Sequence, residues 1–149
     1  MTRARRMTCA VWLLLAACAG STPGFEAEAV LAPLAEPVEE VASLELAALG
    51  YEVDAVQRRS TSFTLSALKI RSGPAPGAVT FDWLHVTIMH HRIVTERPSR
   101  ESARGEIVHV RAVSEEQTRR RRSIPPTPEV IADAMAFIEA MKGARERLP

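Results

Sequence analysis

The sequence predicts an α+β domain: an N-terminal helix, three to four antiparallel strands, and a C-terminal helix packed on one face of the sheet. Two segments, before Gly50 and after Pro128, have apolar residues three and four positions apart, which is the spacing of a helix with one buried face. Between them apolar and polar residues alternate, as in half-buried strands. Both helices are expected on one side of the sheet, because an apolar stripe must pack against another apolar surface.

The N-terminal helix is predicted over residues 37–49. Pro37 suits the first turn of a helix, and Glu39 and Glu40 lie near the positive end of the helix dipole. Gly50 is typical of a helix end, because glycine adopts a left-handed conformation without strain. The predicted apolar face consists of Val38, Val41, Leu44, Ala48 and Leu49.

Strands begin after this helix, where the apolar period changes from 3.6 to 2. Residues 51–56 form one extended segment, and residues 62–70 form the next. Two glycines and two prolines in residues 71–77 then predict a reversal of the chain. One face of the second segment carries the apolar residues Phe63, Leu65 and Ala67.

A long antiparallel hairpin is predicted from residues 79–95 and 107–113, with an arginine-rich loop over residues 96–105. The first strand is rich in β-branched and aromatic residues, which favour extended structure. Its two predicted faces are Leu84, Val86 and Ile88 on one side, and Phe81, Trp83, His85, Thr87, Met89 and His91 on the other.

The C-terminal helix has the clearest start signal in the chain. Thr127 provides an N-cap hydroxyl, Pro128 suits the first turn, and Glu129 places an acid near the positive end of the dipole. Gly143 is predicted to end the helix. Its continuous apolar stripe consists of Val130, Ile131, Ala134, Phe137, Ile138 and Met141.

The beginning of the chain has the three parts of a secretory signal: a basic start, an apolar run, and small residues at the cleavage point. The run from Cys9 to Ala19 has eleven residues, against roughly 20 needed to span a bilayer. The signal is therefore predicted to be removed. The sequence Leu15-Ala16-Ala17-Cys18 at its end resembles the lipobox of bacterial lipoproteins.

This resemblance implies that residues 1–17 are a signal peptide, that residues 18–35 form a lipid-anchored tether, and that residues 36–149 form a single small α+β domain. The thiol of Cys18 would carry acyl chains and hold the protein on the membrane, which is its first expected partner. Ala19 in place of aspartate favours, in the resembled family, the outer membrane on its periplasmic side. No cysteine follows Cys18, so a disulfide framework is excluded after cleavage.

Charge is unevenly distributed along the chain. Residues 25–56 hold eight acidic and no basic residues, whereas residues 57–122 hold thirteen basic and six acidic ones. Four consecutive arginines, Arg119, Arg120, Arg121 and Arg122, follow the last predicted strand. Guanidinium groups bind phosphates and carboxylates, so these residues are candidates for an anionic lipid or glycan of the envelope. The alternative is a solvated strand end whose charges discourage edge pairing.

Histidines form the second candidate site. His85 and His91 share one strand face, and a hairpin centred near Ser99 or Arg100 would bring His109 opposite His90 or His91. Facing imidazoles can hold Zn²⁺ or Cu²⁺, but a firm site needs a third or fourth ligand. The candidate metal ligands are therefore His85, His91 and His109, and the alternative is that they are amphipathic surface residues.

Catalytic motifs are missing after Cys18: the sequence has no nucleophile elbow, zincin motif, glycine-rich phosphate loop or paired cysteines. Asp82, between Phe81 and Trp83, is either a carboxyl of raised pKa or a residue with a turn or edge role. We expect no cofactor, no catalytic residue and no nucleic-acid partner, since stacking aromatics are few. The sequence favours an accessory module that binds an envelope component or partner protein; the alternative is a histidine-dependent metal-binding protein or hydrolase.

Overall fold

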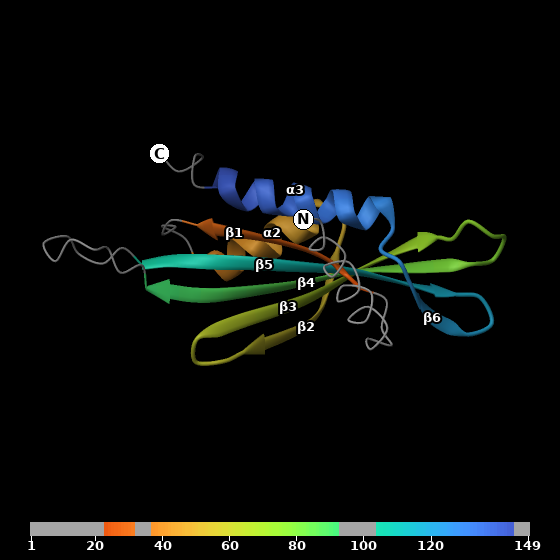
Figure 1. Cartoon of the computed structure of the whole chain (residues 1–149), viewed down its shortest axis with the longest axis horizontal. Coiled ribbons are helices and arrows are strands. Elements are labelled where there is room, and N and C mark those ends of the chain that lie inside the picture. Colours follow the sequence, from red (N-terminus) through yellow and green to blue (C-terminus); the bar gives the residue numbers. More distant parts are fainter. Residues whose placement is uncertain (1–22, 32–36, 93–103, 145–149) are drawn as a thin grey trace, which may run out of the picture.

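The computed structural model describes residues 23–31, 37–92 and 104–144, and it has an α+β fold with six strands and two helices among them (Figure 1). Cys18 lies outside the described residues, so its predicted acylation stays a prediction. The elements in chain order are β1 (Phe25–Leu31), α2 (Val38–Ala48), β2 (Glu52–Arg58), β3 (Ser62–Ser72), β4 (Val79–Arg92), β5 (Arg104–Gln117), β6 (Arg121–Ile124) and α3 (Pro128–Ala144).

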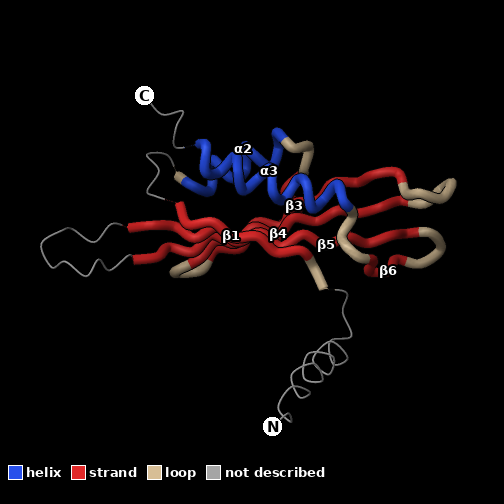
Figure 2. The backbone as a smooth tube through the Cα atoms, turned by 45° about the horizontal axis from the view of Figure 1, so that its top comes forward, coloured by secondary structure: helices blue, strands red, loops and turns tan. Residues whose placement is uncertain are grey.

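The strands form one antiparallel sheet in the order β1-β5-β4-β3-β2, and β6 pairs with the end of β5 beyond β1. The strands β2 to β5 follow one another as hairpins. Because β1 and β2 lie at opposite edges, the chain between them crosses the sheet, and α2 lies within this crossing. Both helices cover the same face of the sheet (Figure 2). The predicted α+β class and the placement of both helices on one side are thus confirmed.

The core lies between that face and the helices. The predicted inner faces are confirmed: Leu84, Val86 and Ile88 of β4 are fully buried, and they lie opposite Ala112, Val110 and Val108 of β5. The alternation of apolar and polar residues therefore sets which face is buried. The helices contribute Val41, Ala42 and Leu46 from α2, and Val130, Ala134, Phe137, Ile138 and Met141 from α3.

The helix α2 begins after Pro37 and is followed by Gly50, whose φ of 84° is the predicted left-handed conformation. Two residues of its predicted face, Leu44 and Ala48, are exposed. Leu44 is 68% exposed, and Leu46 is fully buried in its place. Leu44 is three positions after Val41, and Leu46 is four positions after Ala42, so both fit a helical spacing. The position of the helix on the sheet buries the row through Ala42 and Leu46.

The helix α3 has the predicted N-cap, because the Val130 amide donates a hydrogen bond to Thr127 Oγ1 over 3.2 Å. Its apolar stripe is confirmed, with Ile131 partly buried and the other predicted members buried. The predicted end at Gly143 is wrong, because the helix continues through it to Ala144. Gly143 does not have a positive φ, and glycine ends a helix only when it adopts that conformation.

Two strands were not predicted. The segment 18–35, predicted as a tether, contains β1, which pairs with β5 along its full length from Phe25 opposite Ala112 to Leu31 opposite Glu106. Alternate residues of β1 face the core, but two of them are alanines, so the apolar signal of the strand is weak. The second unpredicted strand is β6, which lies in the segment that contains the arginine run.

Candidate functional site

The hairpin of β5 and β6 determines where the four arginines lie. Gln117 pairs with Arg121 and Glu116 pairs with Arg122 across the hairpin. The Nε and Nη2 atoms of Arg122 donate to Glu116 Oε2 over 3.1 and 2.6 Å, and Glu116 is only 8% exposed. Arg121 donates to Glu115 and lies over the ring of Phe81, 4.3 Å from its centroid. These two arginines therefore have local partners that hold β6 on β5.

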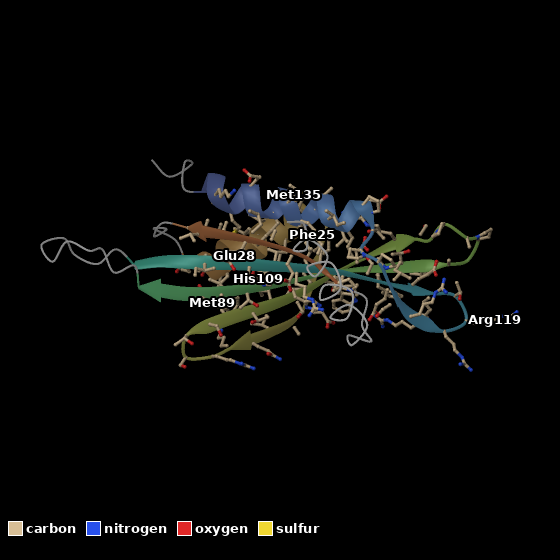
Figure 3. All side chains as sticks on the ribbon, in the orientation of Figure 1. Phe25, Glu28, Met89, His109, Arg119 and Met135 are labelled. Atoms are coloured by element: carbon tan, nitrogen blue, oxygen red, sulfur yellow. The ribbon has the colours of Figure 1, made fainter. Side chains whose placement is uncertain are left out.

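The other two arginines have a different environment. Arg119 and Arg120 lie at the end of the hairpin and are exposed, and within the described part of the chain neither forms an ion pair. Arg119 points away from the sheet into solvent (Figure 3). The sequence treats the four arginines as one run, whereas the structure divides them into two that brace the hairpin and two that are available to an external anion.

The second candidate surface is the face of the sheet turned away from α2 and α3, which we call the helix-free face. No helix or strand of the described residues packs against it (Figure 2). Met89 is 37% exposed, Ile70 is 62% exposed and Val30 is 60% exposed. The register places these apolar residues on it: Val30, Leu68, Ile70, Phe81, Trp83, Met89, Ile107 and Val113.

Trp83 and His85 form the centre of this face. Their rings are parallel to within 5°, with centroids 6.0 Å apart. His85 Nδ1 also lies 3.0 Å from the hydroxyl of Ser66. Burial lowers the pKa of His85, the nearby charge of Arg111 lowers it further, and Glu115 opposes the shift. The imidazole is therefore neutral at neutral pH, and the stacked Trp83–His85 pair is uncharged, with Arg111 directly opposite His85 on β5.

The predicted pairing of the histidines is wrong. His109 lies opposite Thr87, while His90 pairs with Glu106 and His91 with Gly105. A slip of one residue would turn the apolar residues of one strand outward, so the burial of both Val86 and Val110 excludes His90 opposite His109. His91 opposite His109 would keep both apolar sets inward but differs from the observed pairing by four residues along β4. A hairpin centred near Ser99 or Arg100 would shift this pairing.

His85 and His109 nevertheless share the helix-free face, because the residue opposite His109 is Thr87, two positions from His85 on β4. His109 Nε2 lies 3.9 Å from Glu26 Oε2. The side chain of His91 is outside the described side chains. In the described part of the chain no three histidine, cysteine or acidic residues are grouped as metal ligands, and the set His85, His91 and His109 stays a prediction.

Asp82, the carboxylate singled out in the sequence, is completely buried on the inner face. Its Oδ1 accepts a hydrogen bond from Ser114 Oγ over 2.6 Å, and its Oδ2 accepts one from Arg71 Nε over 2.7 Å. Thr127 Oγ1 lies 3.0 Å from both oxygens. Asp82 thus joins β3, β4 and β5 to the N-terminus of α3. This role differs from the predicted turn or edge role, because β4 is a central strand.

A second carboxylate extends the cluster. Asp133 Oδ2 accepts hydrogen bonds from Arg71 Nη2 over 2.6 Å and from Tyr51 Oη over 2.9 Å. Lys69 Nζ lies 3.6 Å from the same oxygen and donates to the Leu49 carbonyl over 2.7 Å. Burial and then the hydrogen bond to Asp133 raise the pKa of Tyr51 far above its ordinary value. We call this set the polar cluster: Tyr51, Lys69, Arg71, Asp82, Ser114, Thr127 and Asp133.

The polar cluster is built to hold elements together. Burial opposes the charge of Arg71, but hydrogen bonds with Asp82 and Tyr51 and the two carboxylate charges outweigh it, and the pKa of Arg71 is raised. Both oxygens of Asp82 accept hydrogen bonds from the protein and the side chain is fully buried, so this carboxylate is not accessible from solvent. Sequence reasoning missed Arg71 and Asp133 because they are 62 residues apart and no local pattern relates them.

Neither helix in the described ranges combines the length and hydropathy that a membrane span requires. No protein-family model matches the chain, and comparisons with curated proteins and with solved structures find no match.

Proposed function

We propose that this chain is a lipid-anchored protein of the bacterial cell envelope that acts as a non-catalytic binding or assembly module. The observation that carries the proposal is the one-sided sheet. Both helices cover one face (Figure 2), and the other face presents aromatic and apolar side chains. Exposed apolar patches of this kind are typical of interaction surfaces. The chain would be anchored through acylated Cys18, as its lipobox implies.

The chemistry of the helix-free face favours a protein partner. Trp83 and Met89 are residue types enriched in the centres of interfaces, and neutral His85 adds a flat stacking surface beside Trp83. Acidic Glu26 and Glu28 border this centre on β1, and Arg111 lies opposite Glu26 on β5. A largely apolar centre with a charged border is the usual anatomy of such an interface.

Site-specific photocrosslinking in intact cells tests this proposal. A photoreactive amino acid at Thr87 lies on the helix-free face, and one at Ala132 lies on the exposed side of α3. We expect a discrete crosslinked product from position 87 and none from position 132. The product should be lost in Trp83→Ala and kept in Met135→Ala, which removes an apolar side chain that is 56% exposed on α3.

Two results would contradict the proposed interface. One is the same set of products from both positions, and the other is a product from position 87 that persists in Trp83→Ala. Melting temperatures of the purified variants show whether each one is folded.

The alternative function, a histidine-dependent metal-binding protein or hydrolase, has less support, because His85 and His109 lie diagonally across two strands and a third ligand is not shown within the described residues.

A further inference from the structure

We infer that the end of the β5–β6 hairpin, through Arg119 and Arg120, binds the phosphates of anionic lipid headgroups in the same membrane that carries the Cys18 anchor. The inference rests on the proposed function, because it takes the anchor as given. It goes further by assigning a ligand to these two arginines and by orienting the domain with the hairpin end toward the bilayer.

The first step of the argument is charge. Arg121 and Arg122 are paired with Glu115 and Glu116, so the acidic residues of the hairpin are already neutralised. Arg119 and Arg120 are exposed at the hairpin end, and neither forms an ion pair within the described residues. Arg119 points into solvent (Figure 3). Two adjacent guanidinium groups suit phosphate oxygens, which they bind in bidentate fashion. Basic residues close to an anionic membrane surface are attracted to it, and the attraction of neighbouring residues adds up.

The second step is rigidity. The β5–β6 turn is short, since β5 ends at Gln117 and β6 begins at Arg121. The ion pair of Arg122 with Glu116 and the stacking of Arg121 on Phe81 hold both strands in place behind it. Arg119 and Arg120 are thus presented from a braced turn, which reduces the entropy lost when a headgroup is bound.

The third step is reach. A Cβ atom built on Gly24 would lie 2.9 Å from the Ala112 carbonyl oxygen and 3.0 Å from Arg111 Nε, so the chain is packed closely against the middle of β5 at this point. Six residue steps separate Gly24 from Cys18 and span at most about 20 Å. The five steps along β5 from Ala112 to Gln117 cover about 17 Å. The anchor and the hairpin end can therefore touch one bilayer together.

The β2–β3 hairpin provides the internal comparison. It also carries two adjacent arginines, Arg58 and Arg59, but Arg58 lies over the ring of Phe63, 4.9 Å from its centroid. The β2–β3 turn lies at the other end of the sheet from the β5–β6 turn, because Ser62 pairs with Met89 near the end of β4, whereas Gln117 pairs with Val79 at its start (Figure 1). With the β5–β6 end on the bilayer, the β2–β3 turn faces away from it and is not expected to bind the membrane.

The experiment uses the full acylated protein in vesicles. Cys18 is the only cysteine after the signal and would be consumed by the anchor, so a fluorophore can be attached to a single new thiol in Thr118→Cys or in Ser60→Cys at the β2–β3 turn. The vesicles contain phosphatidylcholine, with or without phosphatidylglycerol, and a lipid with a nitroxide quencher on its headgroup. We expect strong quenching at position 118 that requires phosphatidylglycerol, and little at position 60.

Charge variants complete the test. Arg119→Gln with Arg120→Gln should reduce quenching at position 118 to the level of position 60, whereas Arg58→Gln with Arg59→Gln, which removes the same charge, should leave it unchanged. Equal quenching at both labels, or quenching at position 118 that survives loss of Arg119 and Arg120, would overturn the inference. Flotation and intact mass distinguish a failure of the proposed anchor from a failure of this inference. An unacylated protein would refute the anchor and with it this inference. An acylated protein without quenching at position 118 would refute this inference alone.

Discussion

Asp82 shows most clearly how a single residue can support this fold. A carboxylate without exposure is unfavourable unless its charge is compensated, and here Arg71, Ser114 and Thr127 supply the compensation. The sequence identified Asp82 as unusual from its apolar neighbours. It gave no information on the partners, because they come from β3, β5 and the start of α3 and meet only in the folded molecule.

Asp82→Ala should therefore destabilise the protein by about 3 kcal/mol, the cost of leaving buried polar partners without their acceptor. Urea unfolding monitored by circular dichroism measures the change. The control is Glu139→Ala, which removes an exposed partner of Lys142 on α3 and should cost less than about 0.5 kcal/mol. Similar losses in both variants would contradict the structural role of Asp82.

Tyr51 makes the polar cluster sensitive to alkaline pH. Its pKa is raised by burial and by the hydrogen bond to Asp133, relative to an ordinary value of 10.0. Above that value the unfolded chain loses the phenol proton while the folded chain keeps it, so the unfolded state binds fewer protons and stability falls as the pH rises. Below pH 10.0 the contribution is fully present.

We expect wild-type stability to decrease more steeply above about pH 10 than that of Tyr51→Phe, which has no phenol proton to lose. Tyr51 is the only tyrosine of the chain, so phenolate absorbance follows its ionisation directly. The absorbance should rise only together with unfolding. A native protein whose tyrosine titrates at its ordinary pKa would show that the phenol is not held by Asp133.

At the scale of elements, the sequence predicted those with strong periodic patterns. The apolar stripe of α3, the capping residue Thr127 and the inner face of β4 are confirmed, because each follows from local spacing. The strand β1 was missed, since two of its inward residues are alanines and its outward residue Val30 is apolar, so apolar and polar residues do not alternate along it. The histidine register was wrong because the pairing of two strands depends on how both bury their faces.

The role of β1 can be tested by placing a charge at its inner face. Ala29 is 7% exposed and lies opposite Val108, so Ala29→Asp should destabilise the fold by about 3 kcal/mol through an uncompensated buried charge. Glu28→Asp on the outward face should be nearly neutral. Urea unfolding compares the two. If residues 18–35 were a tether throughout, as the sequence suggested, both substitutions would be without effect.

At the scale of the whole molecule, the helices and the polar cluster stabilise one side of the sheet, and no helix or strand of the described residues covers the other side. The inner face packs against the buried residues of α2 and α3, and the helix-free face carries Trp83, His85 and Met89. The proposed anchor is consistent with this division of the sheet, because a module that binds partners at a membrane benefits from being held there.

The sequence predicted the division only in part. It placed His85, Trp83 and Met89 on one face of β4. It placed Leu84, Val86 and Ile88 on the other face, and the structure confirms both. The separate roles of the four arginines were beyond its reach, because they depend on Glu115 and Glu116 lying across a hairpin that no turn motif marked.

The central claim is that the mature protein begins at an acylated Cys18, and the intact mass of the protein purified from bacterial membranes tests it most directly. The account predicts the mass of residues 18–149 plus acyl chains, and loss of the added mass in Cys18→Ser. A wild-type protein that retains residues 1–17, or that begins elsewhere and has no acyl mass, would contradict it.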